Sequence, residues 1–194
     1  MTIYLKMEKI AQKISEQCRQ IERKNIERFL DAIIDARRIF VAGVGRSGLI
    51  ARAFGMRLMH LGFTVYVVGE ATTPAIKPGD LLVIVSGSGQ TQAMITAMNV
   101  SRQKGAKVAA ITSFLDSPIG KGADCVVQIK GRQAEDAARD YMDRQLSGEY
   151  DPITPLGTLF ELSAMVFLDA VIDELMERYQ KSEEQLKEFH SDLE

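Results

Sequence analysis

The sequence predicts a single α/β domain, a three-layer αβα sandwich of the flavodoxin-like or Rossmann-like kind, built on a five-stranded parallel sheet. Five short apolar segments have the length and β-branched content of strands buried on both faces. Segments with helical spacing alternate with them, and glycine-rich or hydroxyl-rich loops follow two of the strands. Right-handed crossovers would cover both faces of the sheet with helices and leave a ligand site at the carboxyl ends of the strands.

The elements follow one another with little spare chain between them. Two amphipathic helices are expected within a lead-in of residues 1–37, with part of their apolar surface available for contacts between subunits. The expected strands are 38–42, 64–68, 81–85, 107–112 and 125–129, and the expected helices are 49–61, 90–105, 117–122 and 156–179. A charged, partly helical connection is expected at 131–151 and a polar tail at 182–194.

Composition restricts the class of protein. The chain has 194 residues, of which 46% are hydrophobic, enough for one domain with a full core. A net charge of −2 offers no basic surplus for nucleic acid, so we expect a small ligand. Cys18 and Cys125 show no metal-like or disulfide-like spacing, and no segment has the length of a signal peptide core or membrane span. A cytoplasmic protein with reduced thiols, bound neither to membrane nor to nucleic acid, is expected.

The loop after the third predicted strand has the composition of a phosphate site. It reads Ser-Gly-Ser-Gly-Gln-Thr over residues 86–91 and lies between the end of a strand and the start of a helix. Free backbone N–H groups and the helix dipole favour an anion there, and the side chains add neutral donors. The candidate ligand-binding residues are Ser86, Gly87, Ser88, Gln90 and Thr91. The alternative is an ordinary turn, for which glycine and serine are common choices.

A second loop, Gly43-Val-Gly-Arg-Ser-Gly48, follows the first predicted strand and offers Gly45, Arg46 and Ser47. Its glycine spacing also fits the dinucleotide fingerprint, with Glu70 placed where an acid would bind a ribose, so a nicotinamide enzyme is one alternative. That fingerprint leaves the hydroxyl-rich loop unexplained. Two neighbouring cradles suit a compact sugar phosphate better.

These paired loops resemble those of the sugar isomerase (SIS) domain, in which a Ser-x-Ser-Gly-x-Thr loop binds the phosphate of a sugar phosphate. Further segments are similar to the 6-phospho-3-hexuloisomerase family within it: Met56-Arg-Leu-Met-His-Leu-Gly62, Val67-Val-Gly-Glu70, Pro155-Leu-Gly-Thr-Leu-Phe-Glu161 and His190-Ser-Asp-Leu-Glu194. The likeness spans nearly the whole chain. Gln90 departs from the glutamate of many SIS loops but keeps donor capacity.

The resemblance implies that D-arabino-3-hexulose 6-phosphate and fructose 6-phosphate are interconverted through a cis-enediol, without metal or cofactor. It also implies a homotetramer with active sites near subunit interfaces and a functional pairing with 3-hexulose-6-phosphate synthase in formaldehyde assimilation. Other classes stay open. An arabinose 5-phosphate isomerase would share the core, a non-catalytic sugar-phosphate sensor would share the cradles, and a zinc-dependent heptose phosphate isomerase would need more nitrogen ligands than two histidines supply.

Glu161 is the expected base, since it is a carboxylate early in a mostly apolar helix, where burial would strengthen it as a proton acceptor. The alternative is that Glu161 is a structural residue, since the helix dipole favours an acidic side chain at the start of a helix. His190 is expected to open the furanose ring, from a neighbouring subunit as in related SIS enzymes, and His60 is the competing candidate. Arg46 is expected to assist the phosphate or a sugar hydroxyl. Glu70 is expected to orient a hydroxyl, or to replace Glu161 as base.

Overall fold

The expected sheet is present in the structure, a computed structural model that describes residues 2–131 and 157–180. Its five strands are all parallel and lie in the order β2-β1-β3-β4-β5. Their bounds are β1 Arg38–Gly43, β2 Val65–Val67, β3 Asp80–Val85, β4 Lys107–Thr112 and β5 Cys125–Gln128. The prediction of a five-stranded parallel sheet is confirmed.

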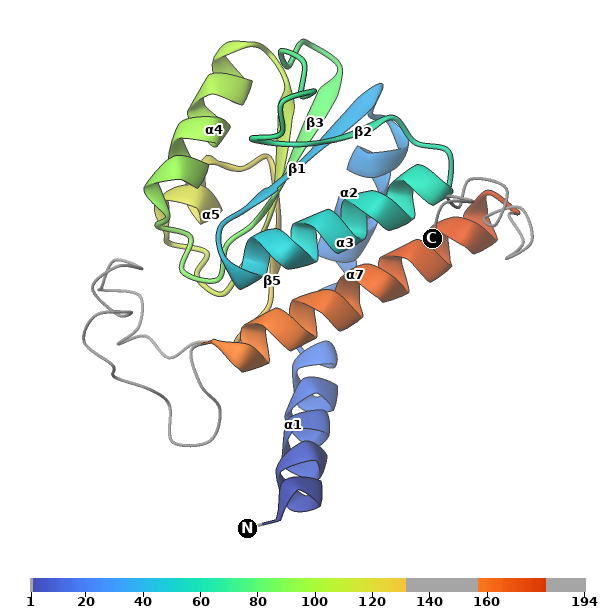
Figure 1. Cartoon of the computed structure of the whole chain (residues 1–194), viewed down its shortest axis with the longest axis vertical. Coiled ribbons are helices and arrows are strands. Elements are labelled where there is room, and N and C mark those ends of the chain that lie inside the picture. Colours follow the sequence, from blue (N-terminus) through green and yellow to red (C-terminus); the bar gives the residue numbers. More distant parts are fainter. Residues whose placement is uncertain (1, 132–156, 181–194) are drawn as a thin grey trace.

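Helices cover both faces of this sheet, as Figure 1 shows. They are α1 Ile3–Cys18, α2 Arg23–Ile34, α3 Arg46–His60, α4 Gln92–Gln103, α5 Pro118–Gly122 and α7 Thr158–Arg178. Side chains of α2, α3 and α7 form one apolar core with the sheet, and those of α4 and α5 form a second core on the other face. The protein is therefore the three-layer αβα sandwich that the alternation of elements predicts.

The central strand β3 explains why both faces need a cover. Leu81, Val83 and Val85 point into the core with α2, α3 and α7, whereas Leu82 and Ile84 point into the core with α4 and α5. All five side chains are buried. Burying each contributes about 1.5–3 kcal/mol, so the continuous apolar run is stable only between two helical layers.

Two boundaries differ from the sequence prediction, both at the loops that are predicted to bind the ligand. The helix α3 begins at Arg46 rather than at residue 49, because Gly45 adopts a φ of 60° and turns the chain directly from the strand into the helix. The helix α4 begins at Gln92 rather than at residue 90, so Gln90 lies in the loop. The first loop is thus shorter than predicted and the second longer.

The lead-in forms the two expected helices, which differ in their packing. The helix α2 buries Phe29, Leu30 and Ile33 against the sheet. The helix α1 projects away from the rest of the chain in Figure 1 and buries none of its residues. The tail 182–194, and all of the connection 131–151 except Gly131, lie outside the described residues. No helix in residues 2–131 or 157–180 is long and apolar enough to span a bilayer.

A buried carboxylate ties the chain together at the amino ends of the strands. Asp80 accepts hydrogen bonds from Arg38 Nε at 3.0 Å, Arg38 Nη2 at 2.6 Å, Arg37 Nη2 at 3.3 Å and the Lys77 N–H at 2.7 Å. Burial alone would raise the pKa of Asp80, but these bonds, led by those from Arg38, outweigh it and hold the pKa below its ordinary value. The network fixes the loop before β3.

Candidate active site

The two predicted ligand loops leave the sheet side by side. The strands β1 and β3 are neighbours, and Gly43 at the end of β1 is in register with Val85 at the end of β3. Neighbouring strands lie about 4.8 Å apart, so the loops 43–48 and 86–91 begin next to each other at the carboxyl edge of the sheet. This is the edge where α/β proteins bind their ligands.

The loop 86–91 is fixed from one side by the segment that follows β4 and by α5, which together form its bracing segment. The Ser113 N–H donates to the carbonyl of Gly87 at 3.1 Å, and the Ile119 N–H donates to the carbonyl of Gly89 at 3.1 Å. In a trans peptide the carbonyl and the following N–H point in opposite directions, so the Ser88 N–H faces away from this bracing segment. The bracing therefore orients a backbone donor as an anion cradle requires.

Gly89 is the residue that allows the loop to lie so close to its brace. Its φ is 64°, and a β-carbon added there would lie 2.0 Å from Ser117 Oγ and 2.6 Å from Ser117 Cβ. The same serine donates from Oγ to the Phe114 carbonyl at 2.6 Å and accepts at Oγ from the Gly120 N–H at 3.1 Å. Both the backbone angle and the contact therefore disfavour any side chain at position 89.

The loop's side chains supply hydroxyl groups without charge. Ser86 and Ser88 are buried, Thr91 is half-buried and Gln90 is exposed. Ser86 Oγ lies 3.4 Å from Thr91 Oγ1, and Ser88 Oγ accepts from the Gln90 N–H at 3.3 Å. Hydroxyl groups can rotate to donate to an incoming anion, so the arrangement suits a phosphate. The ligand-binding role of these residues stays a prediction.

The first loop brings the start of α3 to the same edge. Gly43 and Gly48 touch through their backbones, since a β-carbon on Gly48 would lie 2.7 Å from the Gly43 carbonyl oxygen. Gly45 precedes the helix, Ser47 is buried in the first turn and the Arg46 side chain is 57% exposed. The positive end of the α3 dipole therefore lies beside the loop 86–91.

Glu161 reaches this edge from the first turn of α7, and its role as the base stays a prediction. The helix begins against the segment after β5, where a β-carbon on Gly131 would lie 2.4 Å from Phe160 N. The Glu161 side chain is 6% exposed, and its Oε2 accepts a charge-assisted hydrogen bond from Arg46 Nε. The starts of α3 and α7 lie on the same side of the molecule in Figure 1.

Sequence reasoning missed this ion pair, although it selected both residues. It assigned Arg46 to the phosphate or to a hydroxyl, whereas the structure joins its guanidinium to the predicted base. The two residues are 115 positions apart, and the helices that carry them lie against each other only in the folded chain. Arg46 is available for the contact because α3 begins earlier than predicted and includes it in the first turn.

Glu70 lies just after β2, the edge strand, and forms an ion pair with Arg52 of α3. The side chains are 45% and 54% exposed, so this is a solvated pair, unlike that of Glu161. Arg52 was another partner that sequence reasoning missed. Because Glu70 follows the carboxyl end of β2, it lies at the same edge of the sheet as the two loops. Its charge is balanced by Arg52, and its role toward a ligand stays a prediction.

The structure does not bring His60 to the site of its own chain. His60 is buried at the last turn of α3, and Arg46 occupies the first position of that helix. Fourteen helical steps of 1.5 Å separate them by about 21 Å. His190 lies outside the described residues. Within the described chain, the predicted site residues that meet are those of the two loops, together with Glu161.

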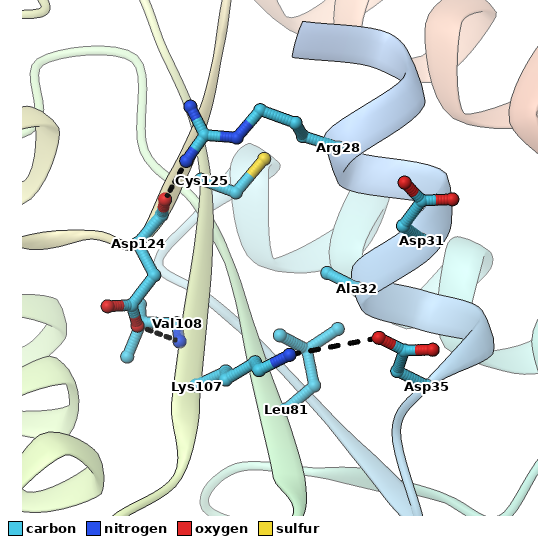
Figure 2. A pocket seen from close by; sticks show the side chains of 9 residues that line it. All are labelled: Arg28, Asp31, Ala32, Asp35, Leu81, Lys107, Val108, Asp124 and Cys125. Carbon is cyan, nitrogen blue, oxygen red and sulfur yellow. Dashed lines mark hydrogen bonds and ion pairs between the residues drawn. The ribbon is translucent and has the colours of Figure 1, made fainter.

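A pocket of about 260 Å³ lies at the opposite edge of the sheet, between α2 and the amino ends of β3, β4 and β5 (Figure 2). Arg28 donates to the Asp124 carbonyl at 2.8 Å, and Lys107 Nζ lies 3.8 Å from Asp35 Oδ2. Burial raises the pKa of the Cys125 thiol on its wall, partly offset by Arg28. The loops and Glu161 contribute nothing to its lining, so this pocket is separate from the candidate site.

The fold and the site together define an α/β protein with two glycine-bearing loops at one edge of the sheet and a buried carboxylate beside them. The SIS domain model matches residues 32–142, which contain all five strands and both loops. The chain belongs to the SIS domain family, as the sequence resemblance indicated.

Several relatives and solved structures match over most of their own length as well as over most of this chain. An uncharacterized protein of Aeropyrum pernix is 43% identical over 196 residues, with 99% of this chain and 92% of that protein covered. The 3-hexulose-6-phosphate isomerase of Bacillus subtilis is 39% identical, with 90% and 89% covered. A Methanococcus jannaschii crystal structure that infers a molecular function of 3-hexulose-6-phosphate isomerase has a TM-score of 0.78 and 32% identity, covering 95% of this chain and 97% of that one.

Proposed function

We propose that the protein is a 3-hexulose-6-phosphate isomerase, the activity also called 6-phospho-3-hexuloisomerase. It interconverts D-arabino-3-hexulose 6-phosphate and fructose 6-phosphate. The observation that carries the proposal is the buried Glu161 carboxylate, paired with Arg46 beside two glycine-bearing loops at one edge of the sheet. Identity of 36–39% to enzymes of that name, over most of the chain, supports the choice of substrate.

The loop 86–91 binds the substrate phosphate. Hydroxyl groups of Ser86, Ser88 and Thr91, with the Ser88 N–H and the amide of Gln90, donate to the phosphate oxygens, while Gly87 and Gly89 keep the backbone close. Gly45 and Ser47 at the start of α3 hold the sugar backbone and its hydroxyl groups, and Glu70 orients a hydroxyl. The anchor carries no fixed charge of its own, so the proton transfers take place away from it.

Glu161 carries both proton transfers. Its carboxylate removes the proton from C2 of the 3-hexulose, and the C–H electron pair becomes the C2=C3 bond of a cis-enediol. The same carboxyl group then returns the proton to C3, while a hydroxyl proton passes from O2 to O3 and leaves the carbonyl at C2. One carboxylate serves both steps because C2 and C3 are adjacent, so the reaction requires neither metal nor cofactor.

A histidine opens the ring of fructose 6-phosphate by protonating its furanose oxygen, for which an imidazole has a suitable pKa range. His190 is the first choice and His60 the second, in either case from a neighbouring subunit. The separation of about 21 Å along α3 between Arg46 and His60 supports that origin for His60. Histidine-to-alanine variants of each distinguish them, since only the ring-opening residue should slow turnover of the closed sugar.

A homotetramer with active sites near the subunit interfaces completes the proposal. The projecting helix α1 exposes Ile3, Tyr4, Leu5 and Met7, which supports association through this helix. We further propose that the enzyme works in the cytoplasm with 3-hexulose-6-phosphate synthase, in the ribulose monophosphate pathway of formaldehyde assimilation. Light scattering of the purified chain tests the subunit count, and a monomer would contradict it.

Deuterium exchange tests the assigned base. Incubation with fructose 6-phosphate in deuterium oxide should place solvent deuterium at C3 with the wild-type protein. The Glu161→Gln variant should lose exchange but keep sugar-phosphate binding, because the amide cannot accept the proton. Glu177→Gln, an exposed acid near the end of the same helix, is the matched control and should exchange normally. Full exchange by Glu161→Gln would remove Glu161 as the base.

A further inference from the structure

We infer that Arg46 serves the proton transfer rather than the phosphate: its Nε fixes Glu161 Oε2, and its remaining guanidinium donors stabilise the enediolate oxygen. This inference rests on the proposed isomerase function and deepens it. It assigns Arg46 to the reacting carbons, whereas the sequence placed it with the phosphate or a hydroxyl group.

The contact between the two side chains sets which carboxylate oxygen can react. Arg46 Nε donates to Glu161 Oε2, and no further hydrogen bond of the Glu161 carboxylate is found among the described residues. The carboxylate is 6% exposed, so it cannot rotate freely in solvent. Oε1 is therefore the oxygen directed to the substrate, and Arg46 determines its orientation.

The Arg46 and Glu161 side chains differ in solvent exposure, and this leaves part of the guanidinium accessible to a substrate. The carboxylate is buried, whereas the Arg46 side chain is 57% exposed. A guanidinium has five N–H donors in a planar fork, and the contact with Glu161 uses only the one on Nε. The Nη1 and Nη2 groups can therefore reach a sugar oxygen while Nε stays on the carboxylate.

The loop 86–91 does not depend on Arg46 for its own structure. Its hydrogen bonds run to the end of β4, to the segment that follows β4, to α5 and within the loop itself. The guanidinium contacts Glu161 at the start of α7 instead, and among the described residues it forms no hydrogen bond with the loop 86–91. A phosphate anchored at 86–91 thus has hydroxyl and backbone donors already, and the arginine charge is placed at the base.

Charge balance explains why a fixed cation belongs there. Before the transfer the negative charge lies on Glu161, and the arginine matches it. When the C2–H bond breaks, an O–H bond forms at Oε1, the C–H electron pair forms the C2=C3 bond, and the carbonyl π pair moves to O3. The charge has then moved from the carboxylate to the enediolate oxygen. Arg46, held between them, stabilises the charge at both ends of the transfer.

Arg46→Ala tests this inference, with Arg46→Lys and the exposed Arg57→Ala of the same helix as comparisons. We expect Arg46→Ala to lower kcat and the rate of deuterium exchange by about 100- to 1,000-fold, as loss of a preorganised charge does. Its Kd for fructose 6-phosphate, measured by calorimetry, should change by less than about threefold, since that lies within 0.7 kcal/mol. Arg57→Ala should match the wild type in both.

Chemical rescue separates a lost charge from a lost fold. Added guanidinium at millimolar concentration should restore exchange by Arg46→Ala at least about tenfold, whereas methylammonium should restore little, because only guanidinium has the planar fork. Arg46→Lys, with a single ammonium group, should remain impaired. A variant that stays folded but gains nothing from guanidinium would overturn the inference.

The outcomes also separate this inference from the proposed function. Suppose that the wild type exchanges deuterium, and that Arg46→Ala weakens binding of fructose 6-phosphate while kcat stays normal. Arg46 then holds the phosphate, so this inference is overturned while the proposed function stands. An Arg46→Ala variant with normal kcat and normal binding overturns it as well. If the wild type neither exchanges nor isomerises the sugar, the proposed function is overturned, and the inference with it.

Discussion

Gly89→Ala should distort the loop 86–91, chiefly through contact with Ser117. The new β-carbon would lie 2.0 Å from Ser117 Oγ, 2.6 Å from Ser117 Cβ and 3.0 Å from Thr112 Oγ1. Holding alanine at a φ of 64° costs about 1–2 kcal/mol, and the overlap adds about 1–3 kcal/mol. The free energy of unfolding should therefore fall by about 2–5 kcal/mol, unless the loop moves away from its brace and gives up ligand binding instead.

Two further variants divide that cost into its parts. Ser117→Gly removes both of the atoms closest to the new β-carbon. Because glycine is tolerated at a helix N-cap, this variant alone should lower the free energy of unfolding by only a few tenths of a kcal/mol. Added to Gly89→Ala, it should recover about 1–3 kcal/mol and leave the backbone strain. Gly62 has a φ of 93°, and nothing lies within 4 Å of a β-carbon added there. Gly62→Ala therefore shows the cost of a side chain at a positive φ without a steric contact.

Urea denaturation measures the change in the free energy of unfolding, and calorimetry measures the change in the Kd for fructose 6-phosphate. Gly89→Ala should weaken binding about tenfold or more if the loop shifts, which corresponds to 1.4 kcal/mol or more. The double variant should bind more tightly than Gly89→Ala. The reasoning is refuted if Gly89→Ala binds as the wild type does and unfolds no more easily than Gly62→Ala, or if Ser117→Gly brings no recovery.

Three more predictions concern other parts of the fold. Asp80→Asn should lower the free energy of unfolding by about 1.5–3 kcal/mol at pH 7, because it removes the buried charge that accepts the hydrogen bonds of Arg38. The pKa of Asp80 is lower in the folded state than in the unfolded state. The stabilisation by its carboxylate is therefore complete above the unfolded-state pKa and is lost as the pH falls through the folded-state pKa. In urea titrations between pH 5 and 2, the stability of Asp80→Asn should therefore depend less on pH than that of the wild type. Gly131→Ala should displace the start of α7, because the new β-carbon would lie 2.4 Å from Phe160 N, and it should reduce kcat in a coupled assay by about tenfold or more. Burial raises the pKa of Cys125, so iodoacetamide should modify the exposed Cys18 first, as mass spectrometry of the peptides can show; faster labelling of Cys125 would contradict its burial.

The sequence predicted the architecture because each signal for it is local. The run 81–85 could be recognised as a strand buried on both faces from its own residues, and the glycines and serines after it marked the loop. Gly45 was part of a recognised motif, yet its φ of 60° and the earlier start of α3 were not evident, because glycine permits many conformations and does not specify one.

The site was predicted only in part because its remaining contacts join distant segments. Glu161 could be selected as a charge in an apolar helix, but nothing near it in the sequence indicated Arg46 as its partner. Ser117 could not be recognised as the brace of Gly89, since its own neighbourhood shows only a helix start. His60 was weighed without the length of α3, which separates it from Arg46 by about 21 Å in one chain.

The most direct test of the isomerase assignment follows the carbonyl itself. Fructose 6-phosphate labelled with carbon-13 at C2 is incubated with the wild-type protein and followed by NMR. Isomerisation should convert part of the C2 signal from the range of a ketose carbonyl or anomeric carbon to that of a secondary alcohol, with a 3-ketose as the only product. An unchanged spectrum at high protein concentration, from a protein that binds the sugar phosphate, would contradict the assignment.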